Sequence, residues 1–170
     1  TFAFHVTGVG GEIIRVPYQD DHEDPKALLA AARTHGAKLI YLSNPDNPMG
    51  SHHPAATLAA MIDALPEGCL LALDEAYVEL APDGTAAVVA ADDPRVIRFR
   101  TFSKAHGMAG LRLGYALAAP DLLLMAALTD NSCKPAPRSV PCRATEDLKA
   151  PPATGLALSV RPSVTGPFDR

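Results

Sequence analysis

The sequence predicts an α/β fold, and two observations lead to this prediction. Short apolar or β-branched runs alternate with helical patterns over residues 1–130, and the run at 69–73 (Cys-Leu-Leu-Ala-Leu) is apolar at every position. Alternating strands and helices favour a sheet with crossover connections. A continuously apolar run is typical of a strand that is buried on both faces of a parallel sheet.

The first strand and helix follow from local residue patterns. Residues 12–16 (Glu-Ile-Ile-Arg-Val) predict a strand. Asp24 and Pro25 predict a helix start, because an N-cap carboxylate followed by proline suits the first turn. Apolar residues then recur at helical spacing until Gly36, which is a typical residue just past a helix end.

The later elements alternate in the same way. Pro54 begins a second predicted helix, which has apolar residues on one face, and residues 121–128 predict a third. The segment at 105–111 is expected to be a short helix or a loop. Further strands are expected at 38–42, 69–73, 96–101 and 113–118.

The last part of the chain differs in composition. Seven of the 16 prolines fall within residues 131–170, and proline at this density removes backbone donors and interrupts helices. We therefore expect a folded part, 1–128, and a largely irregular, proline-rich tail, 129–170. The first residue is not methionine and the pattern changes abruptly near Leu128, so we expect a piece of a longer protein with a divergent end, for which a reading-frame change is one hypothesis.

Composition and charge exclude several classes of function. The 170 residues are 48% hydrophobic, which is enough for a core. The net charge is -4, and the sequence has no basic stripe that would bind nucleic acid and no Lys/Arg cluster that would bind a membrane surface. No apolar run approaches the roughly 20 residues that span a bilayer. Three cysteines without paired spacing predict neither a disulfide framework nor a zinc site, and they favour a reducing cytoplasm. Adjacent His52 and His53 have no third ligand at metal spacing, so no metal is expected.

Polar groups follow two of the predicted strands, at the ends where open α/β sheets bind ligands. Asn44 to Gly50 (Asn-Pro-Asp-Asn-Pro-Met-Gly) predicts a rigid turn that would hold an asparagine amide in a fixed position. Asp74 follows the buried strand at 69–73, where a carboxylate is costly unless it meets a cation. Tyr77 is close enough to contact the same ligand.

A second group of polar residues follows the strand at 96–101. The hydroxyl groups of Thr101 and Ser103 and the guanidinium of Arg112 are suited to a phosphate. Lys104 beside them could form a Schiff base with a carbonyl group. Each motif alone also fits a plain turn, a strand-end salt bridge or a solvated lysine, but their combination and order favour one shared site.

Three segments together resemble the fold type I pyridoxal-phosphate aminotransferases of class I/II, and within them the histidinol-phosphate aminotransferase group. They are 44–50, Asp-Glu-Ala-Tyr at 74–77, and Thr-Phe-Ser-Lys-Ala-His-Gly-Met-Ala-Gly-Leu-Arg-Leu-Gly-Tyr at 101–115. The resemblance covers about residues 1–128. It implies that this part is a partial large domain, built as a three-layer αβα sandwich with a mixed, mostly parallel sheet.

The resemblance also implies the cofactor pyridoxal 5′-phosphate and a role for each matching residue. Lys104 would bind the cofactor as a Schiff base and then move the substrate proton. Asp74 would pair with the pyridine nitrogen, and Tyr77 and Asn47 would donate to the ring 3-oxygen. The remaining cofactor-binding positions are Ser103, Arg112 and Thr101 at the phosphate and Phe2 stacked on the ring.

The function that the resemblance implies is transamination in the cytoplasm. The amino donor would be histidinol phosphate or an aromatic amino acid, the acceptor would be 2-oxoglutarate, and the full-length parent would be a homodimer. Two alternatives stay open from the sequence. One is a pyridoxal-phosphate decarboxylase of a phosphorylated amino acid, and the other is a non-catalytic truncated relic that at most binds the cofactor.

Overall fold

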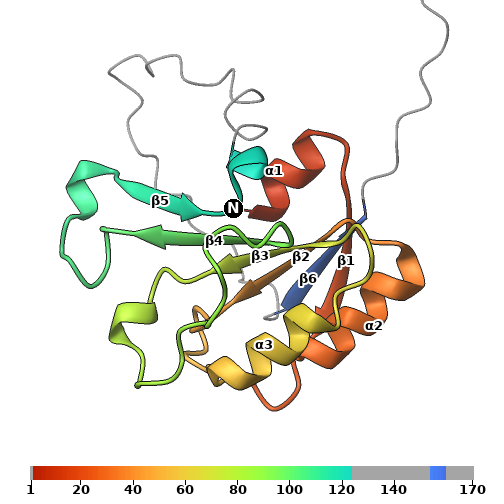
Figure 1. Ribbon diagram of the computed structural model, residues 1–170, viewed down its shortest axis with the longest axis horizontal. Coiled ribbons are helices and arrows are strands. Elements are labelled where there is room, and N and C mark those ends of the chain that lie inside the picture. Colours follow the sequence, from red (N-terminus) through yellow and green to blue (C-terminus); the bar gives the residue numbers. More distant parts are fainter. Residues whose placement is uncertain (1, 124–153, 160–170) are drawn as a thin grey trace, which may run out of the picture.

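The computed structural model describes residues 2–123 and 154–159, which form one sheet flanked by helices (Figure 1). The strand order is β1-β6-β2-β3-β4-β5. Four strands share one direction: β1 (Glu12–Pro17), β2 (Leu39–Ser43), β3 (Leu70–Asp74) and β4 (Val96–Thr101). The other two, β5 (Gly114–Leu117) and β6 (Thr154–Ser159), run antiparallel to their neighbours. The predicted α/β fold with a mixed, mostly parallel sheet is therefore confirmed.

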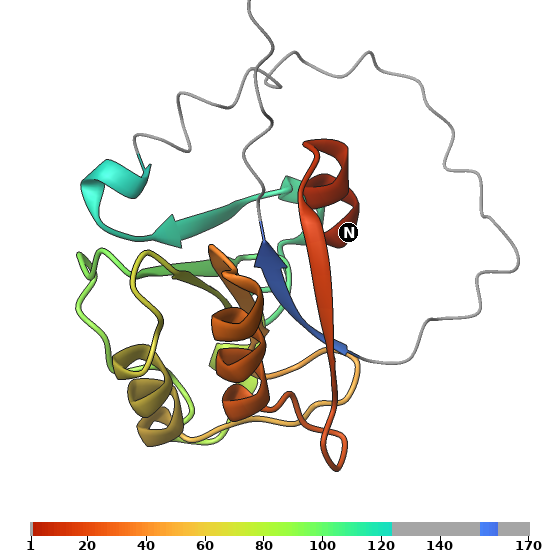
Figure 2. The same cartoon turned by 90° about the vertical axis from the view of Figure 1, so that its right-hand side faces the viewer.

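Two helices cover one face of this sheet. Helices α2 (Pro25–His35) and α3 (Ala55–Asp63) lie side by side (Figure 2), and in Figure 1 the short helix α1 (Phe2–Gly8) lies on the opposite side of the sheet. Strand residues alternate between the faces, so every second side chain of β2 and β3, together with Val96 at the start of β4, packs under the helices. The fully buried members of this core include Leu28, Ile40, Leu42, Leu58, Leu71 and Leu73. Their burial fixes the sheet whose strand ends carry the polar motifs.

The helix ends are built as their residues predict. The Asp24 carboxylate accepts from the backbone N–H groups of Lys26 at 2.9 Å and Ala27 at 3.2 Å, which completes the N-cap. At the other end of α2, Gly36 has a φ of +61°, the left-handed conformation that glycine adopts without strain. Helix α3 begins one residue later than expected, because Pro54 is its N-cap rather than its first helical residue.

Two segments form regular structure that was not predicted, and two others agree with the prediction. Helix α1 was not predicted from the sequence. The segment at 105–111 forms turns followed by the 3-10 helix η2 (Ala109–Leu111), in agreement with the short helix or loop expected there. Residues 120–123 begin a helix, and the rest of the range predicted there lies outside the described residues. Strand β6 also corrects part of the expectation for 129–170. Its six residues pair with both β1 and β2 instead of being irregular, because these two strands offer their edges to a third.

Two further observations concern the cysteine and the helices of the described part of the chain. Cys69 is a free thiol that is 3% exposed within the core, as expected of a small buried apolar side chain. Within residues 2–123 and 154–159, none of the helices has the length and apolar character that crossing a membrane would require.

Candidate active site

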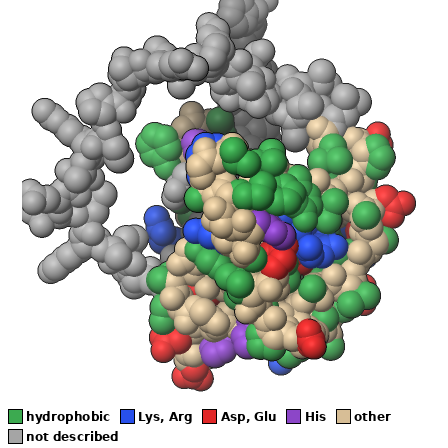
Figure 3. Space-filling model, turned by 90° about the vertical axis from the view of Figure 1, so that its left-hand side faces the viewer, with side chains coloured by type: hydrophobic (Ala, Val, Ile, Leu, Met, Phe, Trp, Pro, Cys, Tyr) green, Lys and Arg blue, Asp and Glu red, His purple; other side chains and the backbone are tan. Residues whose placement is uncertain are grey.

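A cavity of about 320 Å³ lies at the carboxyl ends of β2 and β3. Four of the predicted site residues, Asn47, Asp74, Tyr77 and Lys104, line it. Asp74 ends β3, and the other three come from the loops that follow β2, β3 and β4. These parallel strands bring their ends and loops together at one edge of the sheet. Figure 3 views the molecule from this side and shows acidic, basic and histidine side chains gathered at the centre of the face. The structure thus joins three motifs that are far apart in the sequence.

The Asp74 carboxylate is held by one donor on each oxygen. Oδ1 accepts from the backbone N–H of Ala76 at 3.0 Å, and Oδ2 accepts from the Tyr41 hydroxyl at 2.6 Å. A carboxylate oxygen can accept about two hydrogen bonds, so both oxygens keep room for a cationic N–H donor. The arrangement therefore presents a fixed anion to the cavity.

Tyr77, Asn47 and Lys104 lie within reach of one another beside that anion. The Asn47 side-chain amide donates to the Tyr77 hydroxyl at 3.3 Å. The Lys104 Nζ lies 4.9 Å from the centroid of the Tyr77 ring, in the range of a cation–π contact. An amine, a phenol and an amide thus face the same space, and this donor set is suited to a carbonyl compound that carries an oxygen substituent.

The turn at 44–50 is positioned by a buried asparagine. Asn44 is 1% exposed, and its amide donates to the carbonyls of His53 at 3.1 Å and Thr85 at 3.2 Å. Its Oδ1 accepts from the His53 backbone N–H at 2.7 Å. Asn44 therefore fastens the loop to its surroundings, whereas Asn47 is exposed and directed to the cavity.

The predicted phosphate ligands do not line this cavity. The Thr101 hydroxyl donates to the Leu113 carbonyl at 3.3 Å and accepts from the Ser103 backbone N–H at 3.1 Å, so it shapes the loop before Lys104. Arg112 is exposed, and its guanidinium donates to the Ala109 carbonyl at 3.2 Å. Phe2 is the first residue of α1, and its side chain lies outside the described part of the structure.

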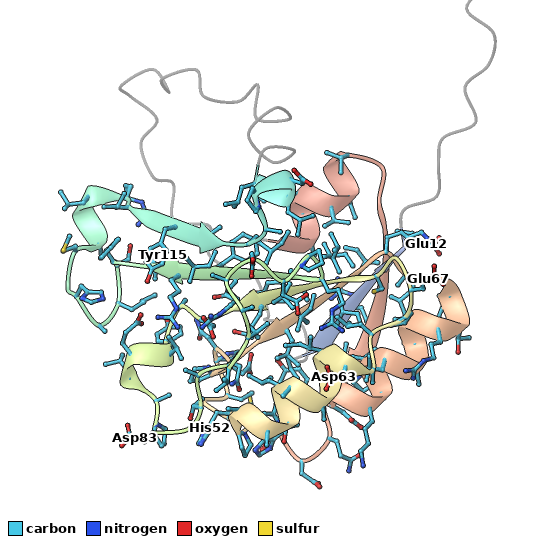
Figure 4. The ribbon with its side chains drawn as sticks, viewed as in Figure 1. Glu12, His52, Asp63, Glu67, Asp83 and Tyr115 are labelled. Carbon is cyan, nitrogen blue, oxygen red and sulfur yellow. The ribbon has the colours of Figure 1, made fainter. Side chains whose placement is uncertain are left out.

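Aromatic contacts support the loop that carries Lys104. The Phe102 ring centroid lies 5.5 Å from that of Tyr115, which is labelled on β5 in Figure 4, and 5.2 Å from that of His106. His106 therefore packs against a neighbouring ring. These contacts join the loop to the last antiparallel strand of the sheet.

A buried acid lies behind Asp74, and it was not identified from the sequence. Glu23 is 4% exposed, lines the same cavity, and accepts from the Ser43 backbone N–H at 2.8 Å. Burial, together with the negative charges of Asp46 and Asp74, raises the pKa of Glu23 to about 8, although the Ser43 N–H opposes the shift. Glu23 is therefore mostly protonated at neutral pH.

Two tyrosines complete the wall of the cavity. Burial, followed by the neighbouring carboxylates, raises the pKa of Tyr18 and of Tyr41 well above the ordinary value, so both phenols keep their protons. The sequence could have indicated Tyr41. Side chains alternate along a strand, so Tyr41 points away from the face that Ile40 and Leu42 occupy and shares the face of the sheet on which Asp74 lies. Glu23, next to a helix cap, carried no comparable signal.

Glu75 points away from the cavity, as its position next to Asp74 on a strand predicts. Its carboxylate is 1% exposed and accepts from Arg98 at 3.0 and 3.1 Å and from Arg100 at 2.9 Å. Two adjacent carboxylates thus have different environments. Glu75 is paired with cations of the protein, and Asp74 is directed to the site.

The two adjacent histidines have separate surroundings. The His53 ring nitrogen Nε2 lies 2.8 Å from the Glu23 carbonyl. His52, labelled in Figure 4 in the loop before α3, lines a second cavity of about 420 Å³ on the other side of Asn47 and Tyr77. Over residues 2–123 and 154–159, no three His, Cys, Asp or Glu side chains gather as metal ligands would.

Comparison with known proteins gives several similar aminotransferases. The family model described as aminotransferase class I and II matches residues 2–139. An aromatic amino acid aminotransferase of Nocardia farcinica is 41% identical over 126 residues, which are 69% of this chain and 35% of that protein. A histidinol-phosphate aminotransferase of Rubrobacter xylanophilus is 45% identical over 112 residues, 64% of this chain and 32% of that protein.

A solved structure agrees with these matches. The histidinol-phosphate aminotransferase from Sinorhizobium meliloti, in complex with pyridoxal-5′-phosphate, is 50% identical with a TM-score of 0.73. The match covers 76% of this chain and 36% of that chain. This chain therefore spans about a third of the length of the relatives that it matches.

Proposed function

Because the chain belongs to the aminotransferase class I and II family, we propose that it carries the pyridoxal-phosphate site of a transaminase. One observation carries this proposal: Lys104, Asp74, Tyr77 and Asn47 come from three separate motifs and line one cavity. Since the chain spans about a third of the length of its relatives, transamination is proposed for the whole enzyme and cofactor binding for this chain.

The residues of the cavity fit the cofactor by their chemistry. A cavity of about 320 Å³ is within the range that holds small ligands. Asp74, fixed by its two donors, would meet the protonated ring nitrogen. The hydrogen-bonded pair of Asn47 and Tyr77 would donate to the ring oxygen. Thr101, Ser103 and Arg112 are proposed as phosphate ligands, on the same loop as Lys104, and Phe2 as the stacking ring.

Lys104 has the central role in this proposal. Its Nζ lies over the Tyr77 ring at 4.9 Å and is exposed toward the cavity, where a carbonyl carbon can reach it. Pyridoxal phosphate supplies, when bound, an electron-accepting ring that stabilises negative charge on the substrate α-carbon. Lys104 would bind the cofactor aldehyde, and its Nζ would later hold the proton that leaves the α-carbon.

The proposed amino donor is histidinol phosphate or an aromatic amino acid, with 2-oxoglutarate as acceptor. The relatives named above support these two donors, because they are named as histidinol-phosphate and aromatic amino acid aminotransferases. We also propose that the full-length parent is a homodimer that acts in the cytoplasm. The mass of the parent in solution tests the first of these two points.

Reduction of the Schiff base tests the cofactor site. The purified chain is mixed with pyridoxal phosphate, the visible absorbance is recorded, and borohydride then fixes the adduct for peptide mapping. We expect a band that bleaches on reduction and a modified Lys104. Lys104→Ala should lose both signals, whereas Lys26→Ala, a change of an exposed lysine on α2, should keep them. An adduct spread over several lysines would contradict the proposal.

A half-reaction tests the chemistry and separates the alternatives. The cofactor-loaded chain is offered histidinol phosphate, phenylalanine or a phosphorylated amino acid, and the products are analysed. Conversion of the cofactor to pyridoxamine phosphate supports transamination. Release of carbon dioxide would instead support a decarboxylase, and binding without conversion would support a chain that only binds the cofactor.

A further inference from the structure

The contact between Tyr41 and Asp74 lies outside every motif that predicted the site. Tyr41 is in the middle of β2, where its Cα partner on β3 is Ala72, and Asp74 is paired with Ser43. The tyrosine therefore reaches diagonally along the shared face of the two strands, and its hydroxyl lies 2.6 Å from Asp74 Oδ2. Such a short distance is typical of a hydrogen bond to an ionised acceptor.

The direction of this hydrogen bond is defined by the surroundings. Burial and nearby carboxylates favour the protonated phenol, so Tyr41 donates and Asp74 accepts. The second Asp74 oxygen accepts from the Ala76 backbone N–H at 3.0 Å. With one donor on each oxygen, the carboxylate cannot rotate about its Cβ–Cγ bond without losing a bond.

From these contacts we propose that Tyr41 is a positioning residue that holds the Asp74 carboxylate in the plane in which it meets the ring nitrogen of pyridoxal phosphate. This inference rests on the proposed function. Tyr41 itself need not touch the cofactor, because its effect passes through the Asp74 carboxylate. Its loss should therefore weaken only those ligands that have a ring nitrogen for Asp74 to bind.

Two ligands separate this effect from a general loss of structure. One is pyridoxal phosphate, and the other is its analogue with a CH group in place of the ring nitrogen. Their dissociation constants are measured by absorbance titration for the unsubstituted chain of 170 residues, called the parent chain from here on, and for Tyr41→Phe, which removes one oxygen atom. We expect the ratio of the two affinities to fall about tenfold in the variant, as for the loss of one charge-assisted hydrogen bond. Partial unfolding would weaken both ligands equally and leave the ratio unchanged.

Tyr18→Phe is the matched control. Tyr18 lines the same cavity, and its hydroxyl bonds to Asp46 rather than to Asp74. The same chemical change at Tyr18 should leave the ratio close to that of the parent chain. The visible absorbance band of bound pyridoxal phosphate should also change its pH midpoint in Tyr41→Phe but not in Tyr18→Phe.

The double variant with Asp74→Asn completes a thermodynamic cycle. If Tyr41 acts through Asp74, Tyr41→Phe should add nothing to the ratio once Asp74 is an amide. An unchanged ratio in Tyr41→Phe, or an equal change in Tyr18→Phe, would overturn the inference. If the parent chain forms no borohydride-fixed adduct at Lys104, the proposed function fails and this inference fails with it. If the adduct forms and the ratio does not change, only the inference fails.

Discussion

Replacing Glu23 by glutamine should make the protein less sensitive to pH. The carboxyl group of Glu23 is buried among Asp46, Asp74 and the Ser43 N–H, and its pKa is raised from 4.5 to about 8. A folded state that holds this proton more tightly than the unfolded chain is favoured at low pH. Its advantage is complete below about pH 4.5 and is lost as the pH rises toward 8. Glu23→Gln keeps an oxygen for Ser43 and has no proton to lose.

The size of the effect follows from the linkage between proton binding and stability. Between the two pKa values, each unit of pH changes the free energy of unfolding by about 1.4 kcal/mol. From pH 5 to pH 8, the parent chain should therefore lose up to about 4 kcal/mol of unfolding free energy relative to Glu23→Gln. Above pH 8 the difference should level off, because both folded and unfolded parent chains are then ionised at this position.

Urea denaturation at a series of pH values measures this difference. Other carboxylates change the absolute stability of both proteins alike, so the quantity to compare is the variant minus the parent at each pH. Glu67→Gln, which changes an exposed carboxylate (Figure 4), is the control and should show a flat difference. A flat difference for Glu23→Gln between pH 5 and 8 would refute the assignment of Glu23 as a protonated buried acid.

Four other substitutions should change stability by defined amounts in urea denaturation. Glu75→Ala leaves the guanidinium of Arg98 buried without its counter-ion and should cost about 3–5 kcal/mol; a cost below 1 kcal/mol would contradict the buried ion pair. Asn44→Ala removes three hydrogen bonds from a buried loop and should cost about 3 kcal/mol, whereas Asn47→Ala at the exposed end of the loop should cost less than about 1 kcal/mol. Gly36→Ala should cost about 1 kcal/mol, because a Cβ there meets no atom within 4 Å and only the φ of +61° opposes it.

The elements of the sheet could be predicted because their signals are local. Asp24, Pro25 and Gly36 define the ends of α2 by capping, which depends on residues within one turn. The strand at 96–101 was expected at the bounds that β4 has. Strand β6 could not be predicted in this way. Its place between β1 and β2 depends on pairing with residues more than 100 positions away.

The site was predictable where a motif carried it and not elsewhere. Asn47, Asp74, Tyr77 and Lys104 were expected from three motifs, and the structure brings them to one cavity. Glu23 enters the same cavity only because its loop folds back against the end of β2, as its bond to the Ser43 N–H shows. That approach is set by tertiary packing, which has no local sequence signal.

The adjacent carboxylates of Asp74 and Glu75 have a consequence for how the strand tolerates change. Successive side chains point to opposite faces, so a slip of the chain by one residue would move one acid into the position of the other. A slip in one direction would place Asp74 before the guanidinium of Arg98, with a side chain one methylene shorter than that of Glu75. A slip in the other direction would place Glu75 at the cavity, in the position of the carboxylate that accepts from Tyr41. The two acids thus fix the register of β3, and an insertion or deletion of one residue within the strand should be eliminated during evolution.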